Sequence, residues 1–202
     1  MKLKVFDIDG TLLKSPMYNK NHWVQENPKV YDRLKHAWWE SRLSLGPPFF
    51  ECPSDSEMHI PHVVEAALEA VQDDDCIVCV MTGRVEKLRD LMEMHVVQGM
   101  GIEPDYFHLR SPFTKTLSYK MKAIDEIINE FEVTHVEMWD DKDSYIPQYN
   151  QFLEDHLPSL SFDIHHIEEE YVTHIDLETE KEIVKRILGE LDLKHHLKHH
   201  AK

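Results

Sequence analysis

The chain has 202 residues, 42% of them hydrophobic, and a formal net charge of −16. A chain of this length and composition can bury one good hydrophobic core, which excludes a disordered or fibrous protein. No run of about 18 apolar residues occurs, so we expect no transmembrane helix, and no apolar signal core precedes the first predicted strand. The negative charge repels nucleic-acid backbones at long range, but it does not exclude a locally basic surface around a metal site.

The first predicted element is a short buried strand formed by Leu3, Val5 and Phe6. Asp7 and Asp9 follow it at a spacing of two, and Gly10 then permits a sharp turn of the backbone. Two carboxylates at a strand end can converge on one cation if the chain turns there, and Mg²⁺ prefers such oxygen ligands. The D-x-D-G-T pattern therefore predicts a metal site at this strand end.

Residues 15–60 form a long connection that contains several aromatic residues and a Gly-Pro-Pro stretch. We expect a short helix over 30–39 and loops at the prolines. A connection this long is usually functional, and here it would act as a lid whose aromatic residues exclude water or stack on a substrate base. The alternative is a satellite core of tryptophans. We favour that alternative for Trp38 and Trp39 and leave both interpretations open for His22 and Trp23.

Helical and strand patterns alternate after the lid. A helix over 61–71 precedes a buried strand over 76–81, which ends in Thr82-Gly83-Arg84 at the start of a further helix over 85–97. A hydroxyl and a glycine at such a junction make a good phosphate cradle. The remaining elements are predicted as a strand over 106–109, a helix over 116–131, a strand over 133–139, a helix over 144–156 capped by Asp143, a strand over 162–167 and a helix over 178–188.

This alternation predicts a mainly parallel sheet with helices on both faces, and ligands then bind at the carboxyl ends of the strands. Asp140 and Asp141 follow the predicted strand over 133–139, where adjacent acids would repel one another without a cation.

We expect one domain over 1–190. Residues 191–202 form a polar, histidine-rich tail, which we expect to be frayed rather than to chelate a metal.

The cysteines are sparse, namely Cys52, Cys76 and Cys79. The C-x-x-C pair lies in a predicted strand, where its two side chains point to opposite faces. We therefore expect buried reduced thiols rather than a redox or zinc pair, and a reducing, cytoplasmic location.

The stretch Asp7-Ile8-Asp9-Gly10-Thr11 resembles the first motif of the haloacid dehalogenase (HAD) superfamily of aspartate-nucleophile phosphatases. This resemblance implies that Asp7 is the nucleophile and a ligand of Mg²⁺. It also implies that Asp9 is the general acid and base and offers its backbone carbonyl to the metal. Carboxylate nucleophiles of this type form aspartyl-phosphates.

Three later stretches resemble the remaining HAD motifs. In the second, Thr82 would bind phosphoryl oxygens, and Arg84 would pair with the substrate phosphate or steady the loop. In the third, Lys120 would neutralise the aspartyl-phosphate, with Lys115 and Lys122 as alternatives. In the fourth, Asp141 is expected to contact Mg²⁺ directly, with Asp140 close by.

An Asn-rich turn after the first motif, an early Trp, a Trp-Trp pair and a Gly-Pro-Pro loop resemble the HAD domain of Swiss Army Knife RNA-repair proteins. The resemblance implies a three-layer, Rossmann-like HAD fold with a lid-like insertion. It also implies removal of phosphate from a nucleotide or a nucleic-acid end, with substrate contacts expected from Gly83, Arg84, Arg110, His22 and Trp23. The acidic charge instead favours a small phosphorylated metabolite such as a sugar phosphate. A catalytically idle binding module is a further alternative. We expect no membrane partner, and the oligomeric state stays open, with a monomer plausible.

Overall fold

The computed structural model describes residues 1–50, 52, 54, 56–156, 159–168 and 175–200, with side chains described through Asp192. The chain divides into two compact units. Unit 1 comprises Met1–Ser15 and Cys52–Tyr171, and unit 2 comprises Pro16–Glu51 and Val172–Lys202. The insertion expected at 15–60 thus overlaps unit 2, which also takes in the last helix. The single domain over 1–190 stays a prediction.

Unit 1 is built around a parallel β-sheet. Its described strands are β1 (Lys2–Asp7), β2 (Cys76–Val85), β3 (Tyr106–Arg110), β4 (His135–Asp140) and β5 (Ser161–His166). They lie in the order β3-β2-β1-β4-β5, and all the neighbouring pairs are parallel. This confirms the predicted α/β fold with a parallel sheet.

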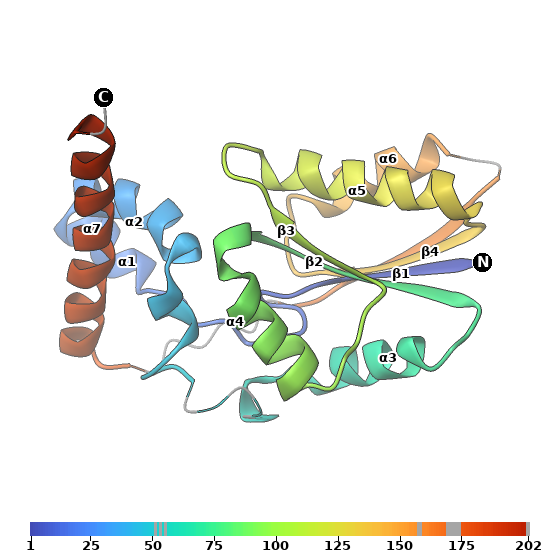
Figure 1. The fold of residues 1–202 in the computed structure, drawn as a ribbon, viewed down its shortest axis with the longest axis horizontal. Helices are drawn as coiled ribbons and strands as arrows, with labels where there is room; N and C mark the ends of the chain where they lie inside the picture. The colour runs from blue at the N-terminus through green and yellow to red at the C-terminus, as the bar shows by residue number, and fades with distance from the viewer. Residues whose placement is uncertain (51, 53, 55, 157–158, 169–174, 201–202) are drawn as a thin grey trace. The chain divides into compact units, whose positions relative to one another are not determined.

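Helices cover both faces of this sheet. Figure 1 shows α5 and α6 above the strands and α3 and α4 below them. These helices are α3 (Pro61–Val71), α4 (Arg89–Glu93), α5 (Thr116–Phe131) and α6 (Ile146–Glu154). The bounds of α3 and α5 are those predicted, because both helices carry a long apolar stripe at helical spacing. Shorter helical turns lie at Arg42–Leu45, Ser56–Met58, Glu86–Leu88 and Met94–Gly99.

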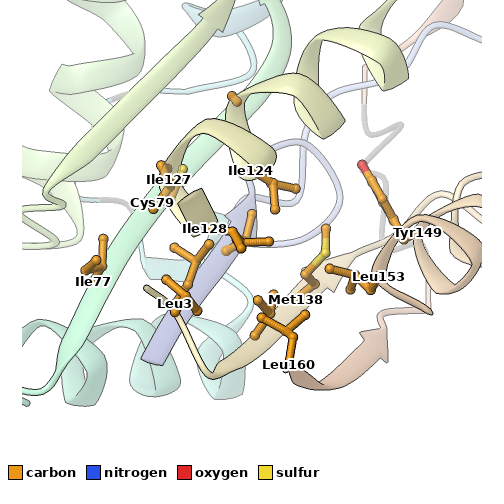
Figure 2. Close-up of a cluster of buried hydrophobic side chains, with 14 of the residues drawn as sticks. Leu3, Ile77, Cys79, Ile124, Ile127, Ile128, Met138, Tyr149, Leu153 and Leu160 are labelled. Atoms are coloured by element: carbon orange, nitrogen blue, oxygen red, sulfur yellow. The ribbon is translucent and has the colours of Figure 1, made fainter. Parts of the chain in front are cut away.

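The core of unit 1 lies between the sheet and the helices α5 and α6. Alternate residues of β1, such as Leu3 and Val5, face this layer, as the period of two in a strand requires. Figure 2 shows the cluster, which includes Leu3, Ile77, Cys79, Ile124, Ile127, Ile128, Met138, Tyr149, Leu153 and Leu160. On the same face of β1, the next alternate residue after Val5 is Asp7, so the core ends where the acidic residues begin.

The strand order reverses next to β1. The chain builds β2 and β3 on one side of β1 and then returns to place β4 and β5 on the other side. Crossover connections diverge at such a switch point and leave a crevice at the carboxyl ends of the strands. Asp7 and Asp140, the last residues of β1 and β4, therefore lie side by side at the carboxyl edge of the sheet.

Unit 2 packs three helices around tryptophans. They are α1 (Lys20–Glu26), α2 (Pro28–Glu40) and α7 (Leu177–His200). Trp38 is fully buried, and its indole N–H donates to the carbonyl of Pro16 at 2.9 Å. The helix expected over 30–39 and the packing role of Trp38 are therefore confirmed. The last helix was predicted to end at Leu188 before a frayed tail, which is wrong, because α7 continues to His200.

Two local predictions are wrong. Asp143 does not cap α6, because α6 begins at Ile146 after Tyr145 without a side-chain cap, and the Asp143 carboxylate instead lies 3.0 Å from Nε2 of His166. The Thr82-Gly83-Arg84 stretch does not open a helix. It continues β2 as extended backbone, and α4 begins only at Arg89.

The described cysteines, Cys52, Cys76 and Cys79, are all free thiols. Burial raises the pKa of the Cys79 thiol far above its ordinary value, which suits a packing role rather than reactivity. Within the described ranges, the helices are too short or too polar to cross a membrane.

Candidate active site

Asp7 and Lys120 form a buried ion pair at the carboxyl end of β1. The ammonium nitrogen of Lys120 lies 2.7 Å from Oδ1 of Asp7, and both residues are buried. Lys120 reaches this position because it lies on the face of α5 that also carries Ala123 and Ile124, three and four residues further on. Lys122, by contrast, pairs with Glu126 in solvent, and Lys115 is exposed. Of the three candidate lysines, the structure thus brings Lys120 to Asp7.

The ammonium of Lys120 also contacts Asp140. Its Oδ2 accepts from the ammonium of Lys120 at 2.7 Å and from the hydroxyl of Tyr149 at 3.1 Å. Its Oδ1 accepts from the backbone N–H of Lys142 at 2.9 Å. Burial alone would lower the pKa of Lys120, but Asp140 and Asp7 outweigh it and hold that pKa well above its ordinary value. Lys120 therefore stays charged between the two aspartates.

Asp7, Asp140 and Asp141 form a three-carboxylate cluster. All three are buried, and each offers an oxygen within 4.8 Å of the others. Burial, together with the charges of Asp140, Asp141 and Asp9, holds the pKa of Asp7 well above its ordinary value despite the opposing effect of Lys120. This acidic, all-oxygen donor set fits a divalent hard cation such as Mg²⁺.

Asp9 lies in a separate hydrogen-bonded pair with Arg84. The guanidinium Nε lies 2.9 and 3.1 Å from the two carboxylate oxygens, and the terminal nitrogen Nη2 lies 2.8 Å from Oδ1. The hydroxyls of Ser15 and Thr82 also donate to Asp9, at 2.6 and 3.0 Å. Burial alone would raise the pKa of Asp9, but Arg84 and these donors outweigh it and lower that pKa. The side chain of Asp9 is thus engaged by Arg84, and its contact with the metal through the backbone carbonyl stays a prediction.

The extended path of β2 explains this pairing. Thr82 and Arg84 both reach Asp9 from the end of β2, where the register with β3 shifts between Thr82 and Val85. Arg84 is fully buried there, and its contact with a substrate phosphate stays a prediction. Gly83, between them, lies so close to Thr116 that an added Cβ would be 2.9 Å from a methyl carbon, so a larger residue would force a shift. Its carbonyl accepts from Nε of Arg110 at 2.8 Å, so Arg110 braces the backbone next to Thr82.

Most of the chain matches a known protein family. Residues 15–192 match HAD domain family 1 in Swiss Army Knife RNA repair proteins. The chain belongs to this HAD family. The matched residues begin just after the D-x-D-G-T stretch, so this motif and the family match are separate observations.

One structural neighbour of this HAD chain is a chain from the structure of the Pnkp1/Rnl/Hen1 complex. The two share 16% sequence identity with a TM-score of 0.48, over 83% of this chain and 47% of that chain. The present chain thus spans about half the length of that neighbour. A search among curated proteins finds no significant match.

The two residues of the insertion that were predicted to contact substrate, His22 and Trp23, lie in unit 2. Trp23 is buried, and its indole N–H donates to the carboxylate of Glu180 in α7. His22 is half-buried, and its ring meets that of Trp23 edge-on at 5.1 Å between centroids. This burial favours the packing interpretation of Trp23 over base stacking. Substrate contacts of His22 and Trp23, and the role of 15–60 as a lid, stay predictions.

Sequence reasoning missed three side chains that support the HAD site. Ser15 donates to Asp9, Tyr149 donates to Asp140, and His166 lies 3.2 Å from the backbone carbonyl of Asp141. Ser15 lies four residues after the first motif and was within reach of a sequence argument. Tyr149 and His166 come from later elements and become visible only when the sheet order is known.

Tyr149 offers a test of this network. Changing it to Phe keeps the ring in the buried cluster and removes one donor from the Asp140 carboxylate. We expect the free energy of unfolding to fall by about 1.5–3 kcal/mol, the range for a hydrogen bond to a charged group. Denaturant unfolding measures this change. Tyr106→Phe is the control, because its ring packs against the same cluster. An equal loss in both variants would contradict the role of the hydroxyl.

Proposed function

We propose that the chain is a Mg²⁺-dependent phosphomonoester hydrolase that works through an aspartyl-phosphate on Asp7. The observation that carries this proposal is the placement of Asp7 at the end of β1, 2.7 Å from the Lys120 ammonium and grouped with Asp140 and Asp141. A phosphoryl group bound here meets a nucleophile, a fixed positive charge and a metal-type donor set. The family match supports the same chemistry.

The chemistry divides into two displacements. A carboxylate oxygen of Asp7 attacks phosphorus in line, the bond to the leaving oxygen breaks, and Asp9 supplies the proton that this oxygen needs. Asp9 then takes a proton from water, the water oxygen attacks the phosphorus of the aspartyl-phosphate, and free Asp7 and inorganic phosphate result. Lys120 and Thr82 hold the developing charge on the phosphoryl oxygens.

The roles of Thr82 and Asp9 in this scheme both require a rearrangement of their hydrogen bonds. In the structure the hydroxyl of Thr82 donates to Asp9, and Arg84 occupies both oxygens of the Asp9 carboxylate. Arg84 also lowers the pKa of Asp9, so Asp9 must free one oxygen and take up a proton from solvent before it can act as the acid. Asp7, Asp140 and Asp141, with the Asp9 carbonyl, would hold the Mg²⁺, which supplies charge neutralisation at the phosphoryl oxygens when bound.

For substrate, we propose a nucleotide or a nucleic-acid end, because the family is one of RNA repair proteins. The formal net charge of −16 favours the second candidate, a small phosphorylated metabolite. A reducing, cytoplasmic location is part of this proposal and rests on the three free thiols. The deciding experiment compares kcat/KM for mononucleotides, oligonucleotide 3′- and 5′-phosphates and sugar phosphates. A consistent preference for sugar phosphates would replace the first candidate with the second.

Metal dependence is the next expected result. Mg²⁺ should raise the melting temperature by about 5–10 °C at a hundred times its Kd, because it relieves the repulsion in the three-carboxylate cluster and binds the folded state. Excess chelator should remove both this shift and the activity. Asp141→Asn should lose most of the shift, whereas Asp74→Asn, in an exposed turn, should keep it. Full activity in chelator without a thermal shift would contradict the metal site.

A further inference from the structure

A strained turn projects an aromatic side chain into solvent between β3 and α5. The turn runs from Ser111 to Thr114, and the backbone N–H and the hydroxyl of Thr114 both donate to the carbonyl of Ser111, at 3.3 and 2.7 Å. Pro112 occupies its second position, and Phe113 occupies the third with φ of +72°. Turns of this pattern normally place Gly or Asn there, because a side chain is strained at positive φ.

Phe113 gains no burial in return for this strain, since its side chain is 97% exposed. A large apolar residue in the left-handed region, with no core contact, does not stabilise the fold. Strained backbone of this kind persists only where its surroundings hold it, and it gathers at binding and catalytic sites. The turn is therefore a candidate for ligand recognition.

Arg110 holds the turn against the active site. Its guanidinium donates to the carbonyl of Gly83 at 2.8 Å and to the carbonyl of Thr114 at 3.1 Å. Gly83 directly follows Thr82, whose hydroxyl donates to Asp9. These two contacts of Arg110 link the turn that carries Phe113 to the end of β2 beside Thr82.

The segment that follows is basic, in contrast to the rest of the chain. From Arg110 to Ile124 it contains Arg110, Lys115, Lys120 and Lys122 and no acidic residue, in a chain whose formal net charge is −16, although Lys120 is paired with Asp7 and Asp140 and Lys122 with Glu126. Lys115 is exposed two residues after Phe113. An aromatic ring in a locally positive segment suits a ligand with an anionic part and a flat π-face.

We propose that Phe113 is the platform on which a nucleobase stacks when a nucleotide or nucleic-acid end delivers its phosphate to Asp7. This inference rests on the proposed function and names the residue that would read the base. It replaces Trp23 in that role, because Trp23 is buried in unit 2 and its N–H is taken by Glu180. Base–aromatic stacking tolerates every base, so Phe113 would favour nucleotides without selecting one sequence.

The test compares two ligands that differ only in the base, adenosine 5′-monophosphate and ribose 5-phosphate. Their Kd values are measured by calorimetry in an Asp7→Asn background, so that turnover does not interfere. Phe113→Ala should lower the preference for the nucleotide by about fivefold or more, the low end of the range for one stacked base. Phe113→Trp should keep the preference, and Phe113→Leu should lose it. Val71→Ala, an exposed apolar position in α3, is the matched control.

The outcomes separate this inference from the proposed function. An unchanged preference in Phe113→Ala, or a preference that Phe113→Leu retains, would overturn the stacking role and leave the exposed ring as a contact for a protein partner. A preference that depends on the ring, in a protein that hydrolyses no phosphomonoester, would keep the stacking role and overturn the proposed reaction. Hydrolysis of phosphomonoesters together with an unchanged nucleotide preference in Phe113→Ala would overturn the stacking role and keep the proposed reaction.

Discussion

Replacing Asp7 by Asn is expected to lower kcat for hydrolysis of an aryl phosphate by about a thousandfold or more. The amide has nearly the shape of the carboxylate but is a far poorer nucleophile. An aryl phosphate is the right probe because its leaving group needs little protonation, so the measurement reports on the first displacement. Steady-state turnover of the purified variant gives the result.

The fold should survive this substitution. Lys120 keeps Asp140 as a partner at 2.7 Å, so no buried charge is left alone. The melting temperature and the far-UV spectrum check this, and Asp74→Asn serves as the control for an acidic residue outside the site. Turnover equal to wild type in a folded Asp7→Asn protein would remove Asp7 from the mechanism. If the wild type is itself inactive on every phosphate ester, the idle binding module becomes the better interpretation.

The local sequence pattern was enough to predict that Asp7 and Asp140 lie at the ends of strands. The strand before Asp7 and the strand before Asp140 alternate polar and apolar residues and end in carboxylates. Once both were predicted to be parallel, their carboxyl ends had to lie at the same edge of the sheet. The structure brings Asp7 and Asp140 together there, with β1 paired to β4.

Lys120 could have been separated from Lys115 and Lys122 by helical periodicity. Ala123, Ile124 and Ile127 lie three, four and seven residues after Lys120, and all of them are buried. A lysine in register with such a stripe must lie against the core, where only a buried acid makes it tolerable. Lys122 is out of that register and is exposed.

The pairing of Asp9 with Arg84 was beyond the sequence argument, because it depends on where a strand ends. The prediction placed Thr82-Gly83-Arg84 at the start of a helix over 85–97. In the structure β2 continues to Val85 with a register shift after Thr82, and the side chains of Thr82 and Arg84 both reach Asp9. The contact of Trp23 with Glu180 joins residues 157 positions apart, and no local pattern specifies it.

Lys120→Met is expected to lower both the free energy of unfolding and the rate of phosphomonoester hydrolysis. The ammonium lies 2.7 Å from both Asp7 and Asp140 and is almost fully buried. Its removal leaves buried carboxylates without a cation, which costs about 3–5 kcal/mol of unfolding free energy. The lost charge at the phosphoryl oxygens should lower kcat/KM by about a hundredfold or more.

Lys122→Met is the matched control. It removes the same charge from the same helix two residues later, but its side chain is 77% exposed and pairs with Glu126 in solvent. Its unfolding free energy should change by less than about 0.5 kcal/mol. Equal effects of the two substitutions on unfolding free energy and on kcat/KM would show that the buried ion pair of Lys120 contributes to neither stability nor catalysis.

The pH dependence of Lys120→Met provides a second readout. Burial and the neighbouring carboxylates already raise the pKa of Asp7 in the folded wild type, while Lys120 opposes that rise. Without Lys120 the folded pKa rises further above the unfolded value of about 3.9, so the folded state binds more protons than the unfolded chain. Stability must then fall as the pH increases from about 4 through the folded pKa.

Metal-free Lys120→Met should therefore be more stable at pH 5 than at pH 8, and Mg²⁺ should recover part of the loss at pH 8 by restoring positive charge. Chemical unfolding at the two pH values, with and without Mg²⁺, measures both effects. Adding Asp140→Asn should also restore stability, because it removes one of the carboxylates that Lys120 had neutralised. A variant whose stability does not depend on pH, Mg²⁺ or Asp140 would show that the three-carboxylate cluster carries less negative charge than its geometry implies.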